Sequence, residues 1–324
     1  MLSGSALAIA IALIKMVVRD LRLPRPPVCP PLPESPVLTK LIAPAVIVFC
    51  TLAAPVAYVQ YGLPAAKPAA PARQPWAVES LPGSIVLVGG TFIDPVGEEV
   101  VRLAGGDKAR VVLIPTAYGP TDVEGVEQFH ELWSRYKPAN ISILHTHDRA
   151  EANDPDFVAP LRDATAVWFL GGVQSRLLDT YGDTLLHQEV RRLFERGGVV
   201  GGNCAGAMAL GETMIVCGEG EEEVVLRPGL GIVPKMVADS HLLERNRIER
   251  LRGVIEEHPD HFGIGIDGAT AVVIERGRLR FIGKSYVATV LPVAQPQGVR
   301  FDVWGQGSEV NLRDLFAAAR ATDQ

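Results

Sequence analysis

Cys204 has the sequence surroundings of a catalytic nucleophile. Gly202 and Gly206 flank it in a G-x-C-x-G pattern, which is the cysteine form of a nucleophile elbow. An apolar strand ends at Val200, and residues 205–210 can begin a helix. Small residues suit a strained turn that a carbonyl carbon must approach, and a helix N-terminus favours thiolate over thiol. We therefore predict that Cys204 attacks a carbonyl; the alternative is a small buried cysteine in a Gly/Ala-rich packing turn.

A histidine that could serve as the general base follows the cysteine by 37 positions. His241 lies just after a short apolar run, so it could stand at a strand end that faces Cys204 and accept the thiol proton. Arg245, Arg247 and Arg250 follow it and could bind a carboxylate through bidentate pairs. Taken singly, such a histidine is more often structural and such arginines more often form a solvated face. The prediction depends on their combination with Cys204.

A paired glycine between a predicted strand and a predicted helix could stabilise an oxyanion. The backbone N–H of Gly172 could face a developing negative charge, and Gln174 could bind a substrate amide or carboxylate. The alternative is a tight turn with a solvated glutamine. Both features lie at the carboxyl end of a predicted strand, as Cys204 does, which is where sites collect in parallel α/β sheets.

Cofactors, metals and nucleic acids are not expected partners of this chain. His145 and His147 have no second pair at ligand spacing, so we predict no metal site. Gly89 and Gly90 lack the rest of a dinucleotide fingerprint. The net charge of −6 argues against nucleic-acid binding. A small peptide or amide substrate is the expected ligand.

From residue 84 onward, short apolar strands alternate with helical segments. Apolar runs without alternation suit strands that are buried on both faces. The rhythm predicts an α/β class fold, a doubly wound and mostly parallel sheet with helices on both faces. The predicted strands are 84–88, 110–114, 140–144, 165–170 and 199–201, and the predicted helices are 123–136, 175–196 and 312–321.

The first 63 residues predict a membrane anchor or a signal region. Residues 2–18 and 41–63 are apolar around a basic, proline-rich stretch, and the second run is long enough to cross a bilayer of about 30 Å. It could also be the apolar part of a secretory signal. Basic residues stay on the cytoplasmic side, so the following domain should be membrane-anchored or secreted and extracytoplasmic. Residues 64–80 form an Ala/Pro-rich linker, and 81–324 the α/β domain.

Four motifs together resemble the cyanophycinase and peptidase E family of S51-type peptidases. They are Gly-Gly-x-Gln before a helix, G-x-C-A-G-A at the elbow, D-x-H followed by spaced arginines, and Gly-Ile-Gly-Ile-Asp ending at Asp267. The resemblance spans residues 84–292. It implies a fold similar to class I glutamine amidotransferases, flavodoxin-like in layout, hydrolysis of peptides at aspartyl residues, and an ability to form homodimers.

The resemblance also implies roles for individual residues. Cys204 would be the nucleophile, His241 the base, and Gly172 and Ala205 the oxyanion donors. The positions that match the family's substrate-binding residues are Gln174, Asp239, Ser240, Arg245, Arg247 and Arg250.

Three positions depart from the family pattern. The family nucleophile is serine where this chain has Cys204, and Ser240 replaces a glutamine that contacts substrate. Gly268 stands where the family has the glutamate that orients the histidine. A cysteine with a low pKa depends less on that third member, and Asp267 could substitute for it by a small shift.

We therefore expect a cyanophycinase-type hydrolase that cleaves a peptide or isopeptide bond next to an acidic residue. Two alternatives remain at this point. A glutamine amidotransferase-like amidase would also use G-x-C-x-G, although the His-x-Glu pair of that group is absent because His241 is followed by Leu-Leu-Glu. A catalytically inactive member of the family would keep the fold and bind a ligand without cleaving it.

Overall fold

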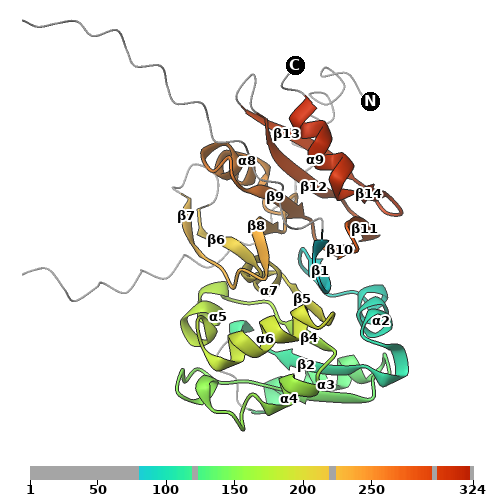
Figure 1. Cartoon of the computed structure of the whole chain (residues 1–324), viewed down its shortest axis with the longest axis vertical. Helices are drawn as coiled ribbons and strands as arrows, with labels where there is room; N and C mark the ends of the chain where they lie inside the picture. Colours follow the sequence, from blue (N-terminus) through green and yellow to red (C-terminus); the bar gives the residue numbers. More distant parts are fainter. Residues whose placement is uncertain (1–79, 119–122, 219–223, 294–297, 322–324) are drawn as a thin grey trace, which may run out of the picture. The chain divides into compact units, whose positions relative to one another are not determined.

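The computed structural model describes residues 80–118, 123–218, 224–293 and 298–321 (Figure 1). The predicted membrane segment and nearly all of the predicted linker lie outside these residues. Within the described ranges, no helix is both long and apolar enough to span a bilayer.

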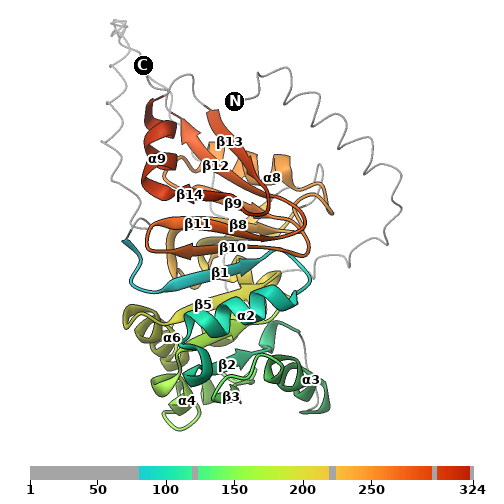
Figure 2. The same cartoon turned by 90° about the vertical axis from the view of Figure 1, so that its right-hand side faces the viewer.

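Five of the strands in an eight-stranded sheet are parallel and lie side by side. Antiparallel strands continue this sheet beyond β1, so β1 lies between the two kinds of pairing (Figure 2). The parallel strands, in spatial order, are β1 (Ser84–Val88), β5 (Val199–Asn203), β4 (Ala166–Phe169), β2 (Arg110–Ile114) and β3 (Asn140–Ile143). The antiparallel strands are β10 (Thr270–Glu275), β11 (Arg278–Gly283) and β14 (Glu309–Asn311).

Helices cover both faces of the parallel strands. In β1, Val86 and Val88 pack with α2 (Asp94–Leu103) and α3 (Val123–Ser134), whereas Ile85 and Leu87 belong to the core on the opposite face. Both faces of the strand are therefore buried, which explains its unbroken apolar run. The opposite face is covered by α4 (Ala159–Asp163), α5 (Gln174–Tyr181), α6 (Leu185–Glu195) and α7 (Ala205–Ala209).

A second, six-stranded sheet is formed by strands that all follow α7 in the chain. Helix α8 (Ile248–Glu257) packs on one of its faces, and α9 (Leu312–Ala321) on the other, where the rings of Phe316 and Phe262 lie 5.5 Å apart. Its strands, in spatial order, are β13 (Gly298–Trp304), β12 (Val287–Val293), β9 (Phe262–Ile266), β8 (Val233–Ser240), β6 (Gly211–Cys217) and β7 (Val225–Pro228). Short 3-10 turns occupy Gly106–Lys108, Thr116–Tyr118 and Glu151–Asn153.

The mixed α/β class is confirmed, and all five predicted strands occur within one or two residues of their expected bounds. Two expectations need correction. The sheet is not a single, mostly parallel one, because antiparallel strands extend it beyond β1 and a second sheet with mixed pairing is also present. The segment 175–196 is two helices, because Gly182 and Asp183, the latter with a φ of 59°, interrupt it.

Candidate active site

Cys204 lies at a strained turn between a central strand and a helix. Its φ of 50° is unusual for a non-glycine residue and is held by hydrogen bonds on both sides of the turn. Its N–H donates to the carbonyl of Val88 at 2.9 Å, and its carbonyl accepts from the N–H of Met208 at 3.1 Å. A side chain on Gly206 would overlap the backbone carbonyl of Phe169 in β4. The glycine spacing noted in the sequence therefore lets α7 pack directly against the sheet.

His241 follows the last residue of β8 and makes a hydrogen bond to Cys204. Its own N–H donates to the carbonyl of Gly89 at 2.7 Å, and its φ of 53° turns the chain out of the strand. A Cβ on Gly90 would lie 2.8 Å from the imidazole ring, so that glycine leaves room for it. One ring nitrogen bonds the sulfur of Cys204. The predicted pair is thus in contact across the two sheets.

Glu244, which the motifs did not single out, completes this group. Its carboxylate accepts a hydrogen bond from Nδ1 of His241. The chain from His241 makes one helical turn, closed by the N–H of Arg245 on the carbonyl of His241 at 2.9 Å. Residues three apart lie on one face of such a turn, which brings the carboxylate back to the ring. With Nδ1 protonated toward Glu244, the other nitrogen is available to exchange a proton with sulfur.

Asp267 supports the turn rather than the ring. One oxygen of its carboxylate accepts the N–H groups of Leu243 at 2.9 Å and Glu244 at 3.1 Å, and the other accepts the hydroxyl of Ser285 at 2.5 Å. The expectation that Asp267 orients the histidine therefore differs from the arrangement seen, in which Glu244 holds the ring. Asp267 fixes the backbone that carries Glu244.

Gly268 makes room for the glutamate. A Cβ on Gly268 would overlap the carboxylate of Glu244. The space that a side chain at position 268 would take is occupied by a side chain from 24 residues earlier. A carboxylate therefore lies beside His241 although residue 268 is glycine.

The protonation equilibria of the pair favour charge separation. Burial raises the pKa of the Cys204 thiol, but the hydrogen bond and charge of His241, with smaller contributions from Ser240 and the N–H of Ala205, lower it to about 7. The bond to Cys204 raises the pKa of His241 against the opposing effect of burial, and the bond to Glu244 raises it further, while Arg245 lowers it. A thiolate–imidazolium pair is therefore accessible near neutral pH.

The two predicted oxyanion donors adjoin the nucleophile. The N–H of Ala205, at the start of α7, bonds the sulfur of Cys204. In the other loop, a Cβ on Gly171 would lie 3.1 Å from the Cβ of Cys204, and Gly172 has a φ of 140°. In the described part of the chain, the N–H of Gly172 takes part in no hydrogen bond. The N–H of Ala205 and the glycine loop that contains Gly172 therefore both lie next to the nucleophile.

Ser240 faces the sulfur instead of open solvent. Its buried hydroxyl lies 3.9 Å from Sγ of Cys204 and donates to Sδ of Met208 at 3.1 Å. The residue expected to contact substrate thus contacts the nucleophile itself.

Three of the predicted substrate-binding residues form a buried ionic cluster. Asp239 is fully buried, and its carboxylate accepts Nε of Arg250 at 2.9 Å and Nη2 at 2.5 Å. Arg247 lies 3.7 Å from the same carboxylate, and Arg250 also donates to the carbonyl of Gly218 at 2.6 Å. Gln174 donates to the carbonyl of Ile215 at 2.8 Å. These groups are bonded within the protein, and Arg245 is the exposed member of the arginine set.

Breaking the buried cluster should cost much of the protein's stability. We expect Asp239→Asn to lower the free energy of unfolding by about 3 kcal/mol, because two buried guanidinium groups lose their counter-charge. Denaturant unfolding followed by circular dichroism measures the change. Glu249→Gln, which affects only the exposed contact with Arg252 at 3.5 Å, is the matched control and should change stability by under about 1 kcal/mol. Equal effects of the two variants would contradict this role for Asp239.

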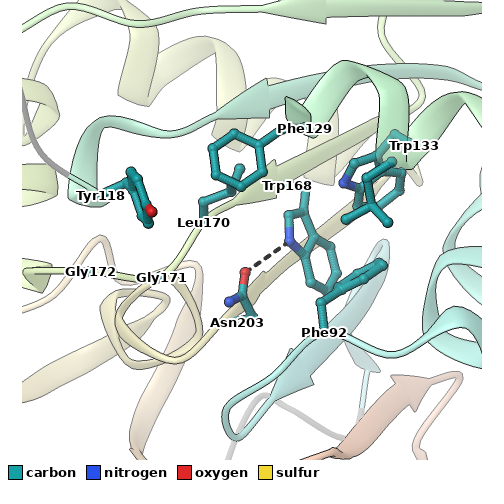
Figure 3. Close-up of a pocket in the computed structure, with 10 residues that line it drawn as sticks. Phe92, Tyr118, Phe129, Trp133, Trp168, Leu170, Gly171, Gly172 and Asn203 are labelled. Carbon is teal, nitrogen blue, oxygen red and sulfur yellow. Dashed lines mark hydrogen bonds between the residues drawn. The ribbon is translucent and has the colours of Figure 1, made fainter. Parts of the chain in front are cut away.

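An aromatic pocket of about 240 Å³ opens beside the glycine loop (Figure 3). Figure 3 shows Trp168 and Asn203 at its floor, joined by a hydrogen bond of 3.3 Å from the indole N–H to the amide oxygen. Its walls come from five separate segments of the chain, which is why no sequence motif indicated it. The lining residues are Phe92, Tyr118, Phe129, Leu132, Trp133, Trp168, Leu170, Gly171, Gly172 and Asn203.

Comparison with known proteins gives consistent similarities. The family model for peptidase family S51 matches residues 85–282. A cyanophycinase of Geminocystis herdmanii is 32% identical over 221 residues, covering 65% of this chain and 81% of that protein. A cyanophycinase of Synechococcus elongatus is 34% identical over 244 residues, covering 71% and 76%. The crystal structure of a peptidase from an acI-B1 Actinobacterium has a similar fold, with a TM-score of 0.56 at 23% identity, covering 71% of this chain and 97% of that one.

Proposed function

Because the chain belongs to peptidase family S51, as its motifs predicted, we propose that it hydrolyses a peptide or isopeptide bond with Cys204 as the nucleophile and His241 as the base. The observation that carries this proposal is the contact between the two side chains, which lowers the pKa of Cys204 to about 7 while raising that of His241. A structural cysteine would not require a strained backbone or a charged partner.

The proposed reaction begins with the thiolate–imidazolium pair. The sulfur of Cys204 attacks the scissile carbonyl carbon, and the negative charge that develops on oxygen is stabilised by the N–H groups of Ala205 and Gly172. His241 gives its proton to the leaving nitrogen, the C–N bond breaks and a thioester remains. A water molecule then attacks the thioester while His241 takes its proton. The C–S bond breaks, the acid leaves, and the proton on His241 restores the ion pair.

Glu244 acts in this scheme as a positioning residue. Its bond to Nδ1 holds the ring and stabilises the imidazolium, which is the role of the acid in a catalytic triad. The hydroxyl of Ser240, 3.9 Å from the sulfur, would also favour the thiolate when its proton turns from Met208 toward Cys204.

We propose that the substrate carries an acidic residue next to the scissile bond, as the family resemblance implied. Arg245 supports this preference, because it is exposed and close enough to lower the pKa of His241. Arg247 and Arg250 are satisfied by Asp239, so their contribution would be to hold the turn that carries Arg245.

The pH dependence of Cys204 alkylation tests the mechanism. We expect the rate of reaction with iodoacetamide at Cys204, followed by mass spectrometry of the digested protein, to rise with a midpoint of about 7. Removing His241 takes away the groups that lower the thiol pKa, so His241→Ala should move the midpoint upward, toward the usual value of about 8.5. His130→Ala, at an exposed histidine of α3, should leave it unchanged.

This experiment, together with hydrolysis assays on free glutamine and aspartyl peptides, separates the alternatives. A midpoint that is ordinary in both proteins would remove the basis for catalysis and favour a protein that binds without cleaving. An activated thiol that hydrolyses free glutamine but no aspartyl peptide would favour the amidotransferase-like amidase.

A further inference from the structure

The pocket in Figure 3 is built to receive an apolar group. None of its ten lining residues carries a charge, and five of them are aromatic. The rings contact one another: Phe92 lies 5.2 Å from both Trp133 and Trp168, and Tyr118 lies 5.6 Å from Phe129 in an edge-to-face arrangement. Such rings form a rigid wall that an aromatic or branched aliphatic side chain can contact on several sides.

Two polar side chains of the pocket, those of Trp168 and Asn203, already have hydrogen-bond partners within the protein. The indole N–H of Trp168 donates to Oδ1 of Asn203, and the amide nitrogen of Asn203 donates to the carbonyl of Gly90 at 3.4 Å. A charged substrate group entering here would lose its hydration without gaining a counter-ion. An apolar group loses nothing comparable and removes hydrophobic surface from water.

One residue that lines the pocket also lies next to the nucleophile. Gly171 lines it and lies so close to the elbow that an added Cβ would be 3.1 Å from the Cβ of Cys204. Asn203, which also lines it, directly precedes Cys204 in the chain, and Gly172 is the proposed oxyanion donor. The pocket is therefore bounded by residues that neighbour the nucleophile and the proposed oxyanion site.

We infer that this pocket binds an aromatic or large aliphatic side chain of the substrate residue next to the scissile bond. The inference rests on the proposed function for the identity of the ligand as a peptide. Arg245, near His241, would favour an acidic residue, and the pocket would favour a bulky apolar residue beside it in the substrate. The aspartyl residue alone does not define specificity.

Binding to the Cys204→Ala protein tests the inference separately from chemistry. The probes are dipeptides in which one residue is aspartate and its neighbour is phenylalanine, leucine, arginine, glutamate or glycine, in both orders and with both ends blocked. We expect the phenylalanine and leucine probes to bind at least about tenfold more tightly than the glycine and glutamate probes, measured by calorimetry.

Variants of the pocket should remove this preference. Phe129→Ala and Tyr118→Ala should each reduce the preference for phenylalanine over glycine about threefold to tenfold, because each removes one ring from the wall. Tyr118 is 54% exposed, so its replacement tests the pocket without disturbing the core. Glu127→Ala, an exposed change on the same helix as Phe129, should leave the preference as it was.

Each outcome decides something different. Equal affinity for all probes, whatever residue neighbours the aspartate, would overturn the inference. So would tightest binding of the arginine probe, through stacking on the rings. Both conclusions would hold even if the unaltered protein hydrolyses aspartyl peptides. Selective binding of the apolar probes without any hydrolysis by the unaltered protein would support the pocket and reject the proposed function.

Discussion

Replacing Cys204 by alanine should reduce peptide hydrolysis by about 10⁴-fold or more, because the thioester can no longer form. Cys204→Ser should retain more activity than Cys204→Ala. A serine is the nucleophile in the family pattern, and His241 is already held by an acid that would assist it. Release of the amine product from an aspartyl peptide, measured for all three proteins at pH 7.5, checks the order.

Thermal unfolding of the same three proteins is the control for this series. Both substitutions are small changes at a position with little room for movement, and neither adds bulk to the turn. If Cys204→Ala kept the parent rate while remaining folded, the nucleophile would lie elsewhere and the mechanism would be rejected.

Removing the charge of Glu244 should also reduce the rate of hydrolysis strongly. We expect Glu244→Gln to lower kcat about 10³-fold, because the amide cannot stabilise the imidazolium that forms during attack. The active ion pair exists above the pKa of Cys204 and below that of His241. Since Glu244 raises the pKa of His241, its loss should move the falling side of the pH–rate profile to lower pH. A residue with a merely structural role would lower the rate without moving this limb.

The space shared by Glu244 and Gly268 allows a sharper version of the test. Gly268→Ala should itself reduce activity, because its Cβ would displace the carboxylate of Glu244. The double variant Glu244→Gly with Gly268→Glu returns the acid to the family position and should be more active than either single change. Glu249→Gln, on the exposed face of α8, serves as the control and should have the parent profile. Additive losses in the double variant would show that the two positions do not supply the same group.

The parts of the site that the sequence predicted depend on short stretches of chain. The elbow at Cys204 and the end of strand β8 at His241 are visible because glycine spacing and apolar runs act over a few residues. The five strands of the parallel sheet were predicted from their apolar runs; four of them are largely buried, whereas β3, at the edge of the sheet, is only partly buried. Among the later strands, only the apolar run that ends before His241 was noted, although β9, β10 and β12 are also apolar and largely buried.

Glu244 escaped prediction because its role depends on distant partners. The sequence His-Leu-Leu-Glu did not match the expected His-x-Glu spacing, and it works only because the positive φ of His241 begins a tight turn. Gly268, which leaves space for the carboxylate of Glu244, lies in another part of the chain. So does Asp267, whose carboxylate holds that turn. The pairing of Arg250 with Asp239 could not be predicted for a related reason, because it requires knowing that both residues are buried together.

Cys204 and His241 come from different sheets, and this separation affects when, during translation, the proposed catalytic pair can form. Cys204 belongs to the eight-stranded sheet and His241 to the six-stranded one, and Gly268 lies on the segment that leads from β9 back to β10. The ribosome releases the cysteine well before the segments that activate it. Until both sheets have formed, the thiol has no imidazole beside it and should behave as an ordinary cysteine. In the proposed mechanism, the nascent protein is therefore inactive until both sheets have formed and His241 lies beside Cys204.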